Sequence, residues 1–523
     1  MSKEINGMQK ESVPGRYRLA IGLTILAGIA LRLGHLIFID LDVPFRLGGL
    51  FLEFSNQIIK DHFALPITIP YYSQNGLPFA YPPLSFYVQA LLINLFHPPK
   101  FLTVNLLPPL VATLGVPSFY YLLRQFTADR LEIWCMLAAF AFIPNTFLDQ
   151  IEAAGLPEAF GELALIWYAV LLVRVYKSPG WSTALTAGIL LGINILSSPG
   201  SAVAAPVLSL VFVLALILQA IRQRSIKSLG VPFIIAMAGL LVSAPYWLTV
   251  VNHHGPGIFI GSLSHQFDSG QRPTFFQQAL DRLLTLDFSS IRNNSFLWSA
   301  LTFLGMLSYL AGPGFHLPIL FILFSLLPRE GIWLSAMLAA FLAGRGLHLL
   351  AESFQDSLQV RRWIEWILAG VFVVAAVYGA ILAVKALVND RQWALEPAQV
   401  AALEEYAGVI PPDADVIAVG NDAFLEWAPQ LLQREVVNTP YGLEWQPGEL
   451  ARVDRFNREL EAAVTFDDVM VSIRERLRLQ EAWLVTDSTS RFAKMAGLST
   501  PQAGSVVQVG VGGDLYIYHL VIK

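Results

Sequence analysis

The sequence predicts a polytopic α-helical membrane protein with a small α/β domain at its C-terminus. Of the 523 residues, 55% are hydrophobic and only 14% are charged, against roughly 25% charged residues in an ordinary soluble protein. The mean hydropathy of +0.56 leaves too few polar residues to cover a water-exposed surface of this size. Charged residues make up about 23% of residues 390–523 but only about 11% of the preceding part. We therefore expect a membrane-embedded body, 1–388, followed by a soluble domain, 389–523.

Composition excludes several other classes of protein. The net charge is only −5, so a nucleic-acid partner, which requires a basic surface, is not expected. The only cysteine, Cys135, lies in an apolar run, and a single cysteine cannot form an intramolecular disulfide. The long apolar runs also exclude disorder, because segments that stay unfolded are polar.

Apolar runs of about 17 residues or more predict membrane spans, because a helix of that length crosses the hydrocarbon core. The first run, Leu19–Ile39, follows four basic residues, which predicts a cytoplasmic N-terminus by the positive-inside rule. With this run the sequence predicts about eleven spans, the others being 101–123, 131–148, 159–176, 183–198, 201–221, 229–251, 293–312, 315–328, 331–350 and 363–388.

The apolar stretch 81–97 is short and begins Tyr81-Pro82-Pro83. If it crossed the membrane, the basic connections near 124–130, 222–227 and 361–362 would face outside. If it is re-entrant or lies along the interface, all of them face the cytoplasm, which the positive-inside rule favours. This topology places the C-terminal domain and the two longest connections, 40–80 and 252–292, on the external side.

Carboxylates mark the first external loop. Asp40 and Asp42 stand at the outer end of the first span, and Glu53 follows on a short amphipathic helix. Carboxylates at the membrane surface can act as a general base or bind a hard divalent cation such as Mg²⁺ or Mn²⁺. The alternative is that Asp40 and Asp42 only mark where the helix leaves the lipid. The apolar side of the amphipathic helix consists of Phe51, Phe54, Ile58 and Ile59.

The acidic loop, the amphipathic helix and Tyr81-Pro82-Pro83-Leu84 with the aromatic pair Phe86-Tyr87 resemble the GT-C superfamily of membrane glycosyltransferases. The closest likeness is to its protein O-mannosyltransferase and aminoarabinose transferase branch, including uncharacterised members. The resemblance continues through most of the chain, in Ala244-Pro245-Tyr246-Trp247, His253-His254-Gly255, Pro328-Arg329, Leu338–Gly344, Glu426-Trp427-Ala428-Pro429 and Gly442-Leu443-Glu444-Trp445.

The resemblance implies a GT-C fold and a reaction in which a sugar passes from a polyprenyl-phosphate donor to a glycan, lipid or protein acceptor on the outer face. An acid of the first external loop then acts as base or metal ligand. Many relatives carry this acid directly before a Gly-Gly pair, where this chain has Leu47. The acid is therefore Asp42, Asp40 or Glu53, or the site is catalytically silent. Asp42, closest to the Gly48-Gly49 turn, is the favoured base and the candidate metal ligand.

Other polar residues are candidates for substrate binding. Arg329 opens a span on the external side, and a guanidinium can bind the leaving phosphate in bidentate fashion. Its alternative role is an interfacial residue paired with Glu330. The remaining candidates are His253 and His254, the second-loop acids Asp149, Glu152 and Glu158, and Tyr81. For each second-loop acid a solvated connection is the simpler interpretation, and for the histidines a loop position without special role is an equal alternative.

Two ionisable residues lie within the first span. Arg32 and His35 are costly to bury at membrane depth, so they indicate a function by default. His35 lies near the outer end of the span and is expected to face the site, whereas Arg32 is expected to pair with a polar neighbour in the bundle.

The C-terminal part has the pattern of a small α/β domain. Strands are predicted at Val416–Val419, Trp483–Thr486, Val506–Val509 and Leu515–Ile522, and helices near 397–407, 449–463 and 466–479. The sequence has no phosphate-binding glycine loop and no nucleophile elbow here, which favours a lid or an acceptor-docking module.

Two further functions stay open at this point. A transporter or flippase of a lipid-linked saccharide would explain the intramembrane charges without catalysis. A catalytically silent scaffold of the cell envelope would explain Leu47 at the position where relatives carry an acid.

Overall fold

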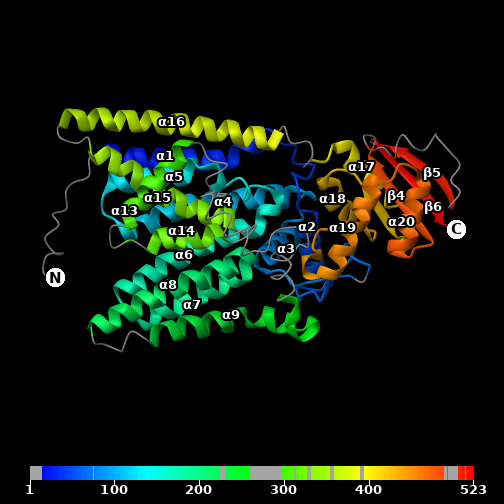
Figure 1. Ribbon diagram of the computed structural model, residues 1–523, viewed down its shortest axis with the longest axis horizontal. Helices are drawn as coiled ribbons and strands as arrows, with labels where there is room; N and C mark the ends of the chain where they lie inside the picture. Colours follow the sequence, from blue (N-terminus) through cyan, green and yellow to red (C-terminus); the bar gives the residue numbers. More distant parts are fainter. Residues whose placement is uncertain are drawn as a thin grey trace.

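A bundle of long helices carries an α/β layer on one of its ends, and α2 (Gly49–Lys60) and α3 (Leu84–Phe96) lie at the junction between them (Figure 1). The computed structural model describes residues 15–523 with the exception of 75, 224–229, 260–295, 311–313, 315, 327–330, 354–357, 389–393, 488–489, 491, 493–503, 513 and 523. We call the bundle end that carries the layer the near end, and the opposite one the far end.

The bundle consists of apolar helices joined mostly by short turns. Within the part of the chain that the structure describes, six helices are long and apolar enough to cross a membrane. Five shorter apolar segments of 10–17 residues, one of them in α3 (Leu84–Phe96), accompany them, so the chain is an integral membrane protein. The bundle helices are α1 (Gly15–Leu33), continued by the 3-10 turn η2 (Gly34–Ile37), α4 (Leu102–Phe126), α5 (Arg130–Phe142), α6 (Leu156–Lys177), α7 (Trp181–Ser197), α8 (Pro199–Gln223), α9 (Gly230–His254), α13 (Phe296–Leu310), α14 (His316–Leu326), α15 (Gly331–Ser353) and α16 (Leu358–Val388).

Two predicted segments need comment. The span predicted over 131–148 is wrong at its C-terminal bound, because α5 ends at Phe142 and Pro144 begins a 3-10 turn. The stretch 81–97 contains α3 (Leu84–Phe96) of 13 residues. A helix of that length measures about 20 Å, less than the roughly 30 Å of the hydrocarbon core. α3 alone is therefore shorter than the hydrocarbon core is thick, and the re-entrant or interfacial position of 81–97 stays a prediction.

Basic connections gather at the far end of the bundle. Lys177, at the end of α6, donates a hydrogen bond to the backbone oxygen of Gln125, near the end of α4. Arg174 likewise contacts the hydroxyl of Tyr121. The turn after α4 and the turn after α6 therefore lie side by side, and Arg130 opens the helix that follows the first of them.

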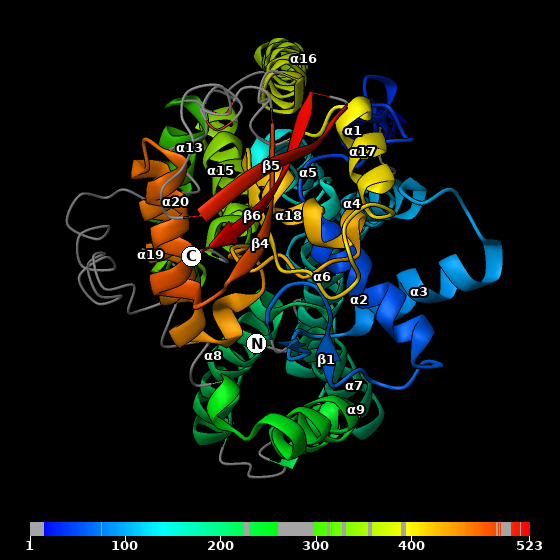
Figure 2. The same cartoon turned by 90° about the vertical axis from the view of Figure 1, so that its right-hand side faces the viewer.

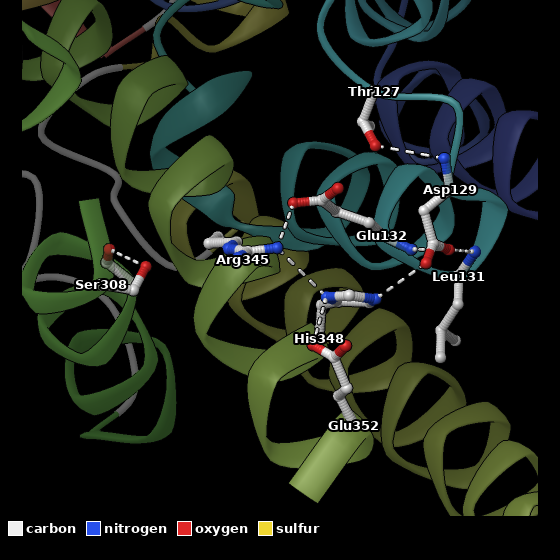
Figure 3. Close-up of polar contacts among 9 residues, drawn as sticks. Thr127, Asp129, Leu131, Glu132, Ser308, Arg345, His348 and Glu352 are labelled. Atoms are coloured by element: carbon white, nitrogen blue, oxygen red, sulfur yellow. Dashed lines mark hydrogen bonds and ion pairs between the residues drawn. The ribbon is translucent and has the colours of Figure 1, made fainter. Parts of the chain in front are cut away.

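A polar network ties α5 to α15 at this far end (Figure 3). Asp129 accepts the backbone N–H groups of Leu131 and Glu132 and so caps α5. Nε2 of His348 lies 3.3 Å from Oδ2 of Asp129, and Arg345 donates to Glu132 at 2.7 Å. The hydrogen bond with His348 lowers the pKa of Asp129 to about 2. The network holds the two helices in register where both leave the apolar core.

The layer at the near end contains one four-stranded sheet with the order β3-β4-β6-β5. β3 and β4 are parallel, and the other two pairings are antiparallel. Its elements are α17 (Pro397–Tyr406), β3 (Val416–Val419), α18 (Asp422–Leu432), the 3-10 turn η7 (Leu443–Trp445), α19 (Pro447–Ala462), α20 (Phe466–Ser472), the π turn η8 (Ile473–Leu477), β4 (Glu481–Asp487), β5 (Gly504–Gly512) and β6 (Leu515–Ile522). We call this set of elements the C-terminal layer.

Alternating side chains of β3 explain how the helices cover the sheet. Val416 and Ala418 pack into the apolar cluster that contains α17 and α18, whereas Ile417 points into the cluster of α19 and α20. This two-residue period is that of a strand buried on both faces. In Figure 2 the strands cross in front of α18, with α19 and α20 on one flank and α17 on the other.

All four predicted strands are present, two of them, β3 and β6, with the predicted bounds. The predicted helices 397–407 and 449–463 correspond to α17 and α19, and the one predicted over 466–479 is divided into α20 and η8. Helix α18 was not predicted. It contains Pro429, and an internal proline normally argues against a helix.

Candidate functional site

The segment between η2 and α3 forms the junction between bundle and C-terminal layer, and we call it the first loop (38–83). It contains α2 (Gly49–Lys60) and a two-stranded ribbon, β1 (Thr68–Ile69) and β2 (Leu77–Pro78). The apolar side predicted for the amphipathic helix is the buried one: Phe54 and Ile58 are fully covered, and Phe51 and Ile59 pack at its edge. α2 is therefore fixed between the bundle and the layer.

A carboxylate from the C-terminal layer caps α2. Glu426 of α18 accepts the backbone N–H groups of Gly48 at 2.7 Å, Gly49 at 2.9 Å and Leu50 at 3.2 Å. These donors have no partner within the helix, and the positive end of the helix dipole favours a negative charge there. Burial raises the pKa of Glu426 to about 7, and the three N–H donors oppose that rise.

Two neighbouring contacts strengthen the same joint, by which we mean the contact between the C-terminal layer and the first loop. Nε1 of Trp427 donates to the backbone oxygen of Arg46 at 2.6 Å, and the hydroxyl of Tyr72 donates to the backbone oxygen of Glu426 at 2.9 Å. The Trp427 ring is completely buried, and it packs edge-on against the ring of Phe101 with 5.6 Å between the ring centroids. The C-terminal layer therefore binds the first loop before Gly48, at Arg46, and after it, at Tyr72.

The loop before α6 holds the first loop from another direction. We call residues 149–158 the second loop. Arg46 forms an ion pair with Glu152, both side chains being mostly buried. A Cβ placed on Gly48 would stand 2.6 Å from Cβ of Ala153, and the φ of Gly48 is +150°. Only glycine allows the two loops to approach so closely.

Helix α4 anchors the part of the first loop that carries the predicted acids. Oδ1 of Asn105 accepts the N–H of Phe45 at 2.9 Å, and its Nδ2 donates to the backbone oxygens of Val43 at 2.8 Å and Leu41 at 3.4 Å. Asp40 and Asp42 remain exposed on this anchored segment. The N–H of Asp42 donates to Oδ1 of Asp40 at 2.9 Å, so the two acids form a local turn.

The third predicted acid has a different environment. Glu53 is only 2% exposed, and Lys60 donates to its carboxylate at 3.2 Å. Burial raises the pKa of Glu53, against the opposing effect of Lys60. Tyr81 is also covered: its ring packs against Phe51 and Trp445 in an aromatic cluster.

The remaining predicted residues fall into three groups. Glu152 is engaged with Arg46, Asp149 is exposed on the second loop, and Glu158 lies half-buried in the first turn of α6. Nε2 of His254 lies 2.9 Å from the backbone oxygen of Ile67 in the first loop, whereas His253 is exposed. Arg329 lies outside the described residues, as does most of the connection 252–292.

Arg32 and His35, the two ionisable residues of the first span, both contact neighbouring elements. Arg32 is fully buried and donates to the backbone oxygens of Gly28 at 3.1 Å and Ala141 at 3.4 Å. The ring of His35 lies 5.3 Å from that of Phe45. Arg32 therefore connects α1 to α5, and the ring of His35 packs against Phe45 of the first loop.

The described residues contain no group of three or more His, Cys, Asp or Glu side chains placed to hold a metal ion. Asp40 and Asp42 supply two carboxylates at most. Mg²⁺ bound through one or two carboxylates completes its shell with water and phosphate oxygens, so these two acids alone would hold a cation only together with such ligands.

Sequence reasoning missed three of the residues that build this site. Asn105, Arg46 and Glu426 make the contacts that fix the first loop. Of the three, only Glu426 could have been found from the sequence, since it belongs to the Glu426-Trp427-Ala428-Pro429 motif noted above.

Comparison with solved structures identifies the architecture. The chain matches ArnT from Cupriavidus metallidurans bound to undecaprenyl phosphate with a TM-score of 0.57 at 15% identity, covering 97% of this chain and 98% of that chain. It matches the Archaeoglobus fulgidus oligosaccharyltransferase, solved with Zn and sulfate, with a TM-score of 0.58 at 14% identity, covering 91% of this chain and 69% of that chain. The chain has the GT-C fold.

The same archaeal oligosaccharyltransferase, tethered to an acceptor peptide, matches with a TM-score of 0.58 at 13% identity, covering 92% of this chain and 70% of that chain. No protein-family model and no curated protein sequence matches the chain. At these identities the likeness establishes the fold and leaves the activity to be argued from the site.

Proposed function

We propose that the chain is a glycosyltransferase that moves a sugar from a polyprenyl-phosphate-linked donor to an acceptor on the external face of the membrane. One observation carries the proposal: in a GT-C fold, Asn105, Glu152 and Glu426 clamp the first loop, and the exposed Asp42 stands on the clamped segment. A base must be held rigidly to take a proton from an attacking group.

Asp42 is the proposed general base. The acceptor hydroxyl loses its proton as it attacks the anomeric carbon, and the carboxylate of Asp42 takes that proton. The bond from the anomeric carbon to the phosphate oxygen breaks, and the polyprenyl phosphate leaves with the electron pair. Asp40 is a positioning residue, because its Oδ1 accepts the N–H of Asp42. Glu53 is the weaker candidate, since it is buried and already paired with Lys60.

The charges at the far end support the proposed orientation. Arg124, Arg130, Arg174 and Lys177 cluster around the turns at that end. Cytoplasmic turns are rich in Lys and Arg, so the far end and the N-terminus are proposed to face the cytoplasm. The first loop and the C-terminal layer then face the external side, where membrane lipids deliver the donor.

Two predicted groups remain part of the proposal without a geometric argument. Arg329 is proposed to bind the donor phosphate, and His253 and His254 at the end of α9 are proposed to contact donor or acceptor. We derive no step through a divalent cation, because the described residues contain no group of three or more side chains placed to hold one.

The test measures transfer by the purified full chain in detergent, with synthetic undecaprenyl-phosphate sugars as donors and membrane glycans as acceptors. Asp42→Asn is expected to lower kcat by 10²- to 10⁴-fold, the usual contribution of a general base. Asp40→Ala is expected to lower it about tenfold, because the acceptor of the Asp42 N–H is lost and the turn loosens. Donor binding should be retained in both variants, because neither residue is proposed to hold the phosphate.

Glu475→Gln provides the matched control, since Glu475 is an exposed acid in η8 of the C-terminal layer. It should leave kcat unchanged. Equal turnover of wild type and Asp42→Asn would refute Asp42 as the base. If Glu53→Gln alone abolished turnover, the catalytic role would move to Glu53.

A further inference from the structure

The C-terminal layer contains a cavity of about 450 Å³ that belongs to none of the contacts described so far. Its described lining lies wholly within this layer, between Ala418 and Phe492. The volume lies within the range of roughly 300–1,000 Å³ that small-molecule sites occupy.

The cavity lies where the sheet topology favours ligand binding. β3 and β4 run parallel, and the cavity is lined by Val419 and Gly420 at the carboxyl end of β3 and by Ser490 just after β4. The first turn of α18 closes it on one side through Asp422 and Leu425. Ligands of open α/β sheets bind at the carboxyl ends of parallel strands, because side chains and loops diverge there.

One wall of the cavity is rigid. Asn438, which is 1% exposed, exchanges two hydrogen bonds with the backbone of Ala418, at 2.9 Å and 2.8 Å. Its Nδ2 also donates to Oδ1 of Asn457 at 3.0 Å, and Nδ2 of Asn457 donates back to the oxygen of Asn438. This double bridge fixes the segment after α18 against α19, so the cavity is preformed.

The lining combines acceptors with an apolar floor. The half-buried Asp422 and the exposed Glu461 contribute carboxylates at its open side, whereas Leu425, Leu460 and Phe492 contribute apolar surface. Two carboxylates disfavour an anionic ligand. A metal ion is also disfavoured, since these acids do not belong to any metal-binding group among the described residues. Carboxylates accept hydrogen bonds from hydroxyl groups, and an apolar floor suits the faces of a sugar ring.

The cavity is linked to the first loop through α19. Arg452 of this helix reaches Oε1 of Gln74 in the first loop, and Asn457 and Glu461 follow on the same helix. A polymeric ligand held in the cavity would therefore contact α19, the helix that also contacts the first loop.

We propose that this cavity binds a neutral saccharide, the acceptor chain of the transfer reaction, with Asp422 and Glu461 accepting its hydroxyl groups. The assignment of the saccharide as acceptor depends on the proposed transferase function. Binding itself does not, and it can be measured without donor.

The experiment titrates the full-length protein in detergent with neutral tetrasaccharides of glucose, mannose, arabinose and N-acetylglucosamine, followed by saturation-transfer NMR. Saturable binding of at least one of them is expected. Glu461→Gln and Asp422→Asn should each weaken it about tenfold, since each removes a charge-assisted hydrogen bond. Leu425→Trp, which fills the cavity from α18, should abolish it.

Asp454→Asn is the matched control, because Asp454 is an exposed acid two turns earlier on α19 and does not line the cavity. It should bind like wild type. The proposal is overturned if no tetrasaccharide binds saturably, if the Glu461 and Asp422 variants bind as wild type does, or if only MgCl₂ or inorganic phosphate binds.

A transfer assay separates this proposal from the previous one. The cavity variants should raise the KM for acceptor with kcat unchanged, whereas Asp42→Asn should lose kcat and still bind saccharide. Saccharide binding without any transfer refutes the transferase and leaves the cavity assignment standing. Transfer by a protein whose cavity variants keep the wild-type KM refutes the cavity assignment alone.

Discussion

Glu426 and Gly48 lie 378 positions apart in the sequence, and the carboxylate of Glu426 accepts the backbone N–H of Gly48 at 2.7 Å. With the bonds from Gly49 and Leu50, this contact makes a residue of the C-terminal layer the cap of α2. The geometry of the first loop therefore depends on the layer.

Replacing Glu426 tests this dependence. Glu426→Ala removes a buried carboxylate and leaves three N–H donors of a helix end without their acceptor, so it should cost about 2–3 kcal/mol of stability. Glu426→Gln should cost less, because the amide oxygen still accepts. Thermal unfolding in detergent measures both, with exposed Glu405→Ala of α17 as control. A midpoint of Glu426→Ala equal to that of the control would show that the cap does not stabilise the joint.

The ion pair between Arg46 and Glu152 predicts coupling between the first and second loops. Both side chains are mostly buried, at 15% and 14% exposure. Arg46→Met or Glu152→Gln alone leaves a poorly solvated charge and should destabilise by roughly 2 kcal/mol, whereas the double variant should lose little more. A double-mutant cycle on unfolding midpoints gives the coupling energy. Additive effects would mean that the pair contributes nothing.

The approach of Gly48 to Ala153 predicts a steric penalty. A methyl group on Gly48 would meet Cβ of Ala153 at 2.6 Å, so Gly48→Ala should destabilise by about 1–3 kcal/mol and reduce transfer by displacing the first loop. Gly22→Ala is the control, because no atom lies within 4 Å of a Cβ at that helical position. It should keep the midpoint or raise it slightly. Wild-type behaviour of Gly48→Ala would show that the loops separate freely.

The folded chain should also lose stability as the pH rises from 4.5 to 7. Burial, and secondarily the charge of Asp415, raise the pKa of Glu435 to about 7 from an ordinary 4.5. Within this window the folded chain holds a proton that the unfolded chain has lost, so stability falls with increasing pH. Glu435→Gln should flatten the dependence of the unfolding midpoint on pH and raise the midpoint at pH 8. A variant with the wild-type slope would contradict this assignment.

Several features of the fold follow from local sequence patterns. The alternation in β3 and the apolar side of α2 are local, so the sequence predicts both. α18 was missed because Pro429 looks like a helix breaker, yet the proline is accommodated within a helix buried against the first loop. The span over 131–148 was too long because its apolar composition continues past Pro144 into a 3-10 turn.

The site was less accessible to sequence reasoning than the fold. The acids Asp40 and Asp42 could be named from their position after the first span. The contacts of Asn105, Arg46 and Glu426 could not, because each joins segments that are distant in the chain, and no local period records such a pairing. Asn105 in particular looks like an isolated polar residue of an apolar helix. Only the fold shows that its side chain accepts the backbone N–H of Phe45.

The cap on α2 also has a consequence for biogenesis. The ribosome makes Gly48 378 residues before Glu426, so the amino end of α2 is made well before the carboxylate that caps it. The loop reaches its final shape only after the C-terminal layer has folded and docked. A chain that stops before α18 can therefore assemble its membrane part and still lack an ordered first loop.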